Sequence, residues 1–260
     1  MLRALYSAAA GMESQQMNLD VISNNLANVN TTGYKESKLQ FQDLLYQTTR
    51  QAGSQQGGSN ELPGSLQIGQ GAIPVATARI FTNGELSQTG NNLDIAIQGA
   101  GFFQVQLPDG TLAYTRDGAF KTDSEGRVVT SDGYPVQGGF QPVPQGTTNI
   151  TIAASGAVTY TTASGTTSSQ IQLANFNNPG GLQAMGQNLF TETPASGNAQ
   201  LGDPQQSGLG QLQQGYLELS NVSVVQEMVN LILAQRAYEV NSKAVQAADQ
   251  MMQDSNNLER

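Results

Sequence analysis

Apolar residues recur every seven positions near the start of the chain, which is the spacing of an amphipathic helix that packs along a seam. Two such series run together here: Leu5, Met12, Leu19 and Leu26 form the first, and Ala8, Gln15, Ile22 and Val29 form the second. This is an a/d heptad pattern over four repeats, with Gln15 as its polar member. It predicts a helix over about residues 2–29, on the order of 40 Å long.

The C-terminal end shows the same spacing. Its series consists of Val224, Leu231, Tyr238, Val245 and Met252. Further apolar residues widen the apolar face of this segment, and they are Val222, Val225, Met228, Val229 and Ile232. The pattern predicts a second long helix over about residues 223–256.

Between the two ends the pattern changes to short β-type runs. Residues 51–64 are rich in Gly, Ser and Gln and read as a loop, whereas residues 72–216 alternate in the manner of strands separated by turn dipeptides such as Asp109-Gly110. The expected fold is therefore mixed α and β, with terminal helices forming a coiled-coil-like inner domain, an extended linker region and an inserted antiparallel β domain. The expected boundaries are 1–30 and 221–260 for the helical assembly domain, 31–71 for the linker and 72–220 for the β domain.

Two arrangements of the terminal helices remain open. On the heptads alone, an ordinary hairpin within one chain is favoured. Amides lie on or beside the first seam, at Asn24, Asn25 and Asn28 among others, and polar seam residues specify register and partner number at a cost in stability. They favour contacts between copies of the chain, and both arrangements can hold together.

Composition and charge exclude several classes of function. The net charge is −9, and no Lys or Arg lies between Val128 and Gln235, so nucleic acid is not expected as a partner. The chain has no Cys and no His, which excludes disulfides, thiolate chemistry and a His base, and no metal site or cofactor is expected. No run of apolar residues approaches the ~20 of a membrane span, so no membrane insertion is expected.

Without His or Cys, a catalyst would need a carboxylate pair, a Ser-Lys pair or a Tyr, and most of the clustered carboxylates have a simpler role. Asp109, Asp117, Asp132 and Glu125 directly precede glycines in turn sequences, where a carboxylate serves the local backbone. An enzyme is not expected.

Three segments resemble one known family, the bacterial flagellar axial proteins that include rod and hook subunits. "SNNLANVNTTGYK" (23–35) resembles its N-terminal signature, "NLDIAIQGAGFFQVQLPDGTLAYTRDGAF" (92–120) its central segment, and residues 214–252 its C-terminal segment. A length of 260 residues favours the distal rod over the longer hook subunit, and residues 46–71 resemble the extension by which rod subunits differ from hook subunits. A proximal rod paralogue is the nearest alternative, and a secreted β-rich binding module is the alternative from another class.

The resemblance implies a structural subunit that polymerises, transmits torque from motor to hook and encloses an export channel. The implied partners are copies of itself, proximal rod proteins, the hook protein, and the periplasmic and outer-membrane ring proteins that form a bushing. The implied location is the basal-body rod across the periplasm, reached by flagellar type III export without a cleaved signal peptide. The residues expected at the assembly interface are Leu5, Met12, Leu19, Ile22, Asn24, Asn25, Leu26, Asn28, Val224, Met228, Leu231, Tyr238, Val245 and Met252.

Overall fold

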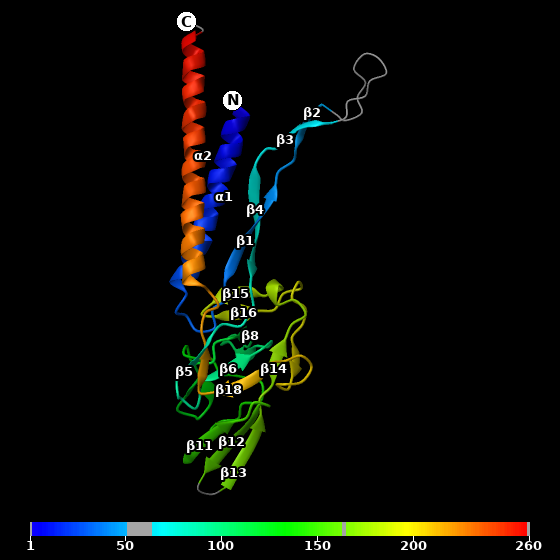
Figure 1. The fold of residues 1–260 in the computed structure, drawn as a ribbon. Coiled ribbons are helices and arrows are strands. Elements are labelled where there is room, and N and C mark those ends of the chain that lie inside the picture. The colour runs from blue at the N-terminus through cyan, green and yellow to red at the C-terminus, as the bar shows by residue number, and fades with distance from the viewer. Residues whose placement is uncertain (1, 51–63, 163–164, 259–260) are drawn as a thin grey trace. The chain divides into compact units, whose positions relative to one another are not determined.

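The computed structural model describes residues 2–50, 64–162 and 165–258, and Figure 1 shows their fold. The chain divides into two compact units. The helical unit comprises residues 1–26, 37–78 and 223–260, and the β unit comprises residues 27–36 and 79–222. The prediction of mixed α and β, with a helix at each end and strands between, is confirmed. Coiled-coil packing of the helices stays a prediction.

Two long helices dominate the helical unit. Helix α1 spans Leu2–Ala27 and α2 spans Val224–Leu258, close to the ranges that the heptads predict. The two helices run side by side in opposite directions (Figure 1). None of the described helices is long and apolar enough to cross a membrane.

Two strand pairs complete the helical unit. Strand β1 (Ser37–Asp43) pairs with β4 (Ala72–Arg79), and β2 (Gln47–Arg50) pairs antiparallel with β3 (Leu66–Ile68). We call β1 and β4 the ribbon. Residues 51–63 of the expected extension lie outside the described part of the chain.

The β unit is built of short strands joined mainly by tight turns. Its strands are β5 (Leu86–Gln88), β6 (Ile95–Gln98), β7 (Phe103–Gln106), β8 (Leu112–Thr115), β9 (Lys121–Thr122), β10 (Val128–Val129), β11 (Thr147–Ile152), β12 (Ala157–Thr162), β13 (Gly165–Gln170), β14 (Leu173–Asn175), β15 (Gln183–Gly186), β16 (Leu189–Thr191), β17 (Gln200–Gly202), β18 (Gln211–Gln214) and β19 (Tyr216–Glu218), with a 3-10 turn at Pro179–Gly181. The larger sheets have the orders β15-β16-β8-β7 and β11-β12-β13, and the smaller ones are the pairs β18-β6, β19-β5, β14-β17 and β10-β9. The pairings β7–β8 and β11–β12, each joined by a turn dipeptide, are antiparallel as predicted, and the long-range pairing β6–β18 is antiparallel as well.

The four-stranded sheet carries an apolar core on each face. Successive side chains of a strand point to opposite faces. Phe103 and Ala113 therefore belong to the larger core, while Phe102 and Tyr114, their neighbours in sequence, belong to a smaller aromatic core. This double burial explains why the consecutive residues Phe102 and Phe103 are both buried, and it gives the β unit a closed core of its own.

Candidate assembly interface

Large apolar side chains that remain exposed are concentrated in the helical unit. Among the described residues, 21 large apolar side chains are exposed, of which 18 lie in the helical unit and 3 in the β unit. The three in the β unit are Leu112, Met185 and Leu201. Scattered exposed apolar residues are normal for a monomer, whereas a contiguous group marks an interaction site. The helical unit is therefore the candidate interface.

Near its start, helix α2 is buried on one side and carries exposed apolar residues on the opposite side. On one side Glu227 and Ala234 are buried, followed further along by Ala248. On the opposite side lies a stripe with the i, i+3, i+4, i+7 spacing of one helix face, which we call the α2 stripe: Val225, Met228, Val229 and Ile232. All four are exposed, Val225 to 75% and Ile232 to 56%. A contiguous apolar face that its own chain leaves exposed is a candidate surface for contact with another molecule.

Two contacts establish how α1 and α2 meet. The Asn25 side chain donates from Nδ2 to Glu227 Oε2 at 3.4 Å. Gly11 lies fourteen residues before Asn25 in α1, and Asn241 lies fourteen residues after Glu227 in α2. A Cβ added at Gly11 would lie 2.8 Å from Nδ2 of Asn241. Equal steps in opposite directions mean an antiparallel pair in constant register over four turns. The absence of a side chain at Gly11 allows the close approach.

The side of α1 that carries Asn25 also packs on the ribbon and its end. Ser14 Oγ donates to the carbonyl oxygen of Ala72 at 2.9 Å. The Asn25 side chain binds the backbone of Ser37 twice, donating to its carbonyl oxygen at 2.8 Å and accepting from its N–H at 3.0 Å. Asn25 is thus buried between three segments of its own chain.

The residues predicted at the interface fall into three groups. Ile22 and Asn25 are buried within the chain. Half-buried are Leu5, Met12, Leu19, Leu26, Asn28, Leu231, Val245 and Met252. Exposed are Asn24, Val224, Met228 and Tyr238. The structure therefore buries only Ile22 and Asn25 of this set within the chain, and the role of the set between copies stays a prediction.

The Asn-rich signature continues into the β unit, where a turn depends on glycine. Gly33 has φ +68° and donates its N–H to the carbonyl oxygen of Glu218 at 2.8 Å. An added Cβ there would lie 2.6 Å from the backbone nitrogen of Asp117. Because a side chain is disfavoured by both the backbone angle and the space, the position requires glycine. Thr32 Oγ1 also donates to Asp117 Oδ1 at 2.9 Å, which holds the same turn.

A buried ion network, which the sequence reasoning missed, lies beyond this turn. Glu218 Oε1 accepts from Lys35 Nζ at 2.6 Å and from the Gly84 N–H at 2.9 Å, and its Oε2 lies 3.3 Å from Arg116 Nη1. The side chains of Lys35 and Glu218 are fully buried. Lys35 Nζ also donates to the carbonyl oxygen of Thr82 at 2.8 Å. We call Lys35, Arg116 and Glu218 the ion network.

The alternation of side chains along a strand is a sequence signal that would have indicated the burial of Arg116. Tyr114 and Arg116 are two residues apart and so share one side of their segment, the side of the aromatic core. The Arg116 guanidinium lies over the ring of Phe102 at 5.2 Å, a cation–π contact. Burial lowers the pKa of Arg116 and of Lys35 below their ordinary values, while Glu218 opposes the shift in both.

Two of the carboxylates expected to serve turns, Asp109 and Asp117, accept backbone N–H groups of their own turns, as Asp123 also does. Asp109 Oδ1 accepts from the N–H of Thr111 at 3.0 Å, and Asp123 Oδ1 accepts from the N–H groups of Glu125 and Arg127. Among the described residues, no group of three or more Asp or Glu side chains is arranged to hold a metal ion.

Comparison with known proteins gives concordant matches along the whole chain. Three family descriptions match: "Flagella basal body rod protein" over residues 5–35, "Flagellar hook protein FlgE/F/G D1 domain" over residues 96–160, and "Flagellar basal body rod FlgEFG protein C-terminal" over residues 213–258. Relatives named flagellar basal-body rod protein FlgG match from end to end. The one from Caulobacter vibrioides is 49% identical, with 99% of each chain covered. That from Borreliella burgdorferi is 48% identical with both chains fully covered, and that from Buchnera aphidicola (subspecies Schizaphis graminum) is 47% identical with 99% of this chain and all of the relative covered.

The closed β unit, the two terminal helices and these matches together define a structural subunit of the bacterial flagellum. The resemblance read from residues 23–35, 92–120 and 214–252 is confirmed. The chain belongs to the flagellar basal-body rod protein family, and its location is the flagellar basal body.

Proposed function

We propose that the chain self-assembles through its helical unit into the distal part of the rod, where the polymer transmits torque from motor to hook and encloses the export channel. The observation that carries this proposal is the concentration of 18 of the 21 exposed large apolar side chains in the helical unit. Full-length similarity to FlgG relatives supports the distal rod over a proximal paralogue, and it disfavours a secreted binding module.

The energy available to such an assembly is substantial. Fully burying an exposed Val, Ile or Met side chain contributes about 1.5–3 kcal/mol. The four residues of the α2 stripe are half to three-quarters exposed. Their burial would contribute roughly 3–7 kcal/mol per copy before the entropy of association is subtracted.

In this proposal the terminal helices form a coiled-coil-like inner tube. The fourteen-residue spacing between the Asn25–Glu227 and Gly11–Asn241 contacts supports it, because two heptads separate them on each helix. The exposed members of the predicted interface, Met228 among them, then contact neighbouring copies. The half-buried members complete their burial in the polymer.

The remaining partners follow from the place of such a rod. Proximal rod proteins adjoin one end and the hook protein the other, and the periplasmic and outer-membrane ring proteins surround it as it crosses the periplasm. Export would proceed without cleavage of the N-terminus. The packing of Ala8 and Ser14, both buried, supports this, because a cleaved leader would remove residues that α1 uses for its contacts.

A charge placed on the α2 stripe tests the proposal. Ile232→Asp should leave folding of the free chain unchanged, since the side chain is exposed, but should prevent polymerisation because a carboxylate would be buried between copies. Gln246→Asp, at another exposed position of α2 and two heptads further along, is the matched control and should polymerise normally.

The assay is complementation of a strain that lacks its own subunit, followed by electron microscopy of isolated basal bodies, with circular dichroism of the purified variants. Rods of normal length with Ile232→Asp would contradict the proposal. So would equal loss with both variants.

A further inference from the structure

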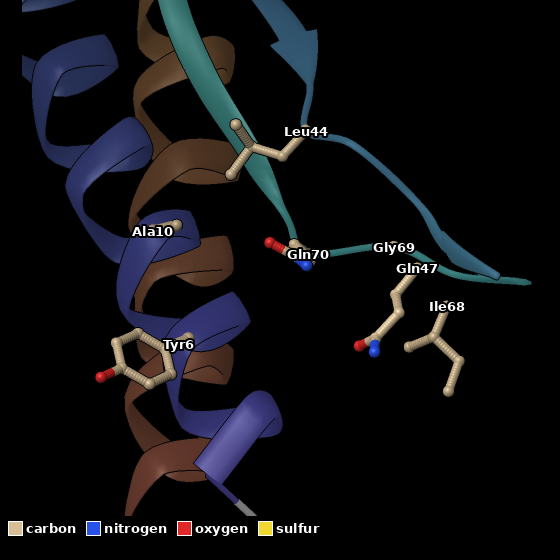
Figure 2. Close-up of a pocket in the computed structure, with 7 residues that line it drawn as sticks. All are labelled: Tyr6, Ala10, Leu44, Gln47, Ile68, Gly69 and Gln70. Carbon is tan, nitrogen blue, oxygen red and sulfur yellow. The ribbon is translucent and has the colours of Figure 1, made fainter. Parts of the chain in front are cut away.

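A pocket opens beside the N-terminal half of α1. Its cavity volume is about 310 Å³. Figure 2 shows side chains from α1 along one part of it and residues from the connections around β2 and β3 along the other. The lining residues are Tyr6, Ala10, Leu44, Gln47, Ile68, Gly69 and Gln70.

The chemistry of this pocket suits apolar side chains. No lining residue is charged, and its only side-chain polar groups are the Tyr6 hydroxyl and two amides. Tyr6 is 75% exposed, and Ile68 is exposed as well. A volume near the lower end of the ~300–1,000 Å³ usual for ligand sites accommodates a few side chains. No group in the lining would hold the charge of a nucleotide or an organic anion.

The matching surface on the same chain is the α2 stripe. It is uncharged, and its four side chains project from consecutive turns of one helix face. A neutral apolar ridge and a neutral apolar pocket can associate without leaving a charge unpaired.

The chain cannot insert its own stripe into its own pocket. The Asn25–Glu227 contact places the stripe level with the C-terminal end of α1, whereas the pocket lies at residues 6–10. About sixteen residues of helix separate the two levels, which is roughly 25 Å at ~1.5 Å per residue. A stripe that enters this pocket must therefore belong to another molecule.

We infer that the pocket binds the α2 stripe of a second copy, displaced by roughly 25 Å along the helix axis. This inference rests on the proposed function and specifies one of its contacts. Because the two surfaces differ and lie at different levels of the helical unit, the contact is heterologous. Repetition of a heterologous contact that does not close gives an open, polar filament.

Cysteine cross-linking tests the contact directly, since the chain has no Cys of its own. Copies carrying Tyr6→Cys are mixed with copies carrying Met228→Cys, polymerised and oxidised, and the products are separated without reductant. Both positions are exposed in the single chain. A disulfide needs Cα atoms within about 7 Å, so a bond forms only where the two copies meet. We expect a cross-linked dimer in high yield from the mixture and none from either variant alone.

The matched control replaces Met228→Cys by Glu239→Cys. Glu239 lies eleven residues further along the same face of α2 and is exposed to a similar degree. It should give at least ten times less dimer, because it is displaced by about 16 Å along the axis. If Tyr6→Cys impairs polymerisation, Ile68→Cys with Ile232→Cys repeats the test on the same surfaces.

Polymer formation is measured separately by sedimentation and electron microscopy. Polymers that form without a Tyr6–Met228 cross-link, or with an equally strong cross-link to Glu239, overturn the inference and leave the proposed function intact. A wild-type chain that forms no polymer overturns both.

Discussion

Replacing Glu218 by alanine removes the carboxylate that holds two buried cations in the β unit. In the wild-type ion network one negative charge is shared by Lys35 and Arg116, so the network carries one net positive charge. The substitution leaves two buried cations without a carboxylate and the N–H of Gly84 without its acceptor.

The expected loss of stability follows from these contacts. Removing one partner of a buried ion pair costs about 3–5 kcal/mol. A buried N–H left without an acceptor costs about 1–3 kcal/mol. The total of roughly 4–8 kcal/mol is comparable with the whole stability of a typical domain, about 5–15 kcal/mol. Glu218→Ala should therefore unfold the β unit at low denaturant concentration or prevent its folding.

Lys35→Met is the matched control because it removes a charge from the other side of the network. It leaves Glu218 and Arg116 as a neutral pair and keeps an unbranched apolar side chain in the buried space. The main loss is the hydrogen bond to the carbonyl oxygen of Thr82, so the cost should be only about 1–2 kcal/mol.

The measurement is urea unfolding of the full chain, followed by tyrosine fluorescence because the chain has no Trp. The reasoning is refuted if Glu218→Ala lowers the free energy of unfolding by less than 1 kcal/mol, or if Lys35→Met costs more than Glu218→Ala.

Three further predictions concern pH, monomer dynamics and polymer stiffness. Burial holds the pKa of Lys35 below its unfolded value of about 10.4. Between the folded and the unfolded pKa the unfolded state binds more protons, so the free energy of unfolding should rise with pH in that window. The same pH titration of Lys35→Met should lack this rise. In dilute monomer, amide exchange should be fast in α1 and α2 and slow in β6, β7 and β8, since a lone helix pair buries only part of its apolar surface; strong protection of both helices would contradict this. Deleting residues 51–64 should give polymers that form but bend more easily, as measured by their curvature in electron micrographs, and unchanged stiffness would refute a stiffening role.

Local periodicity was sufficient to locate both helices. A seven-residue repeat and a long apolar stripe predict a helix whatever surrounds it, and the observed Leu2–Ala27 and Val224–Leu258 lie within two residues of the predicted ends. Turn dipeptides and alternation likewise predicted an antiparallel β region, because both signals act over a few residues.

Periodicity did not decide which helix face turns inward. The predicted C-terminal seam was the Val224 series, yet Val224 and Tyr238 are exposed while Glu227, Ala234 and Ala248 are buried. The start of α2 carries two apolar series with seven-residue spacing, Val224 with Leu231 and Val225 with Ile232, so its sequence offers two candidate seams. Only the position of α1 and its Asn25 determines which of them is covered within the chain.

The ion network could not be predicted from the sequence for a related reason. Lys35, Arg116 and Glu218 are separated by 81 and 102 residues, and each alone reads as an ordinary surface charge. Their burial depends on long-range packing that brings the segment after α1, the end of β8 and the end of β19 together in one unit. The amino-acid sequence by itself therefore determined the elements and the family, while the tertiary structure decided which charges are buried and which apolar face remains exposed, since burial is a property of contacts between distant segments.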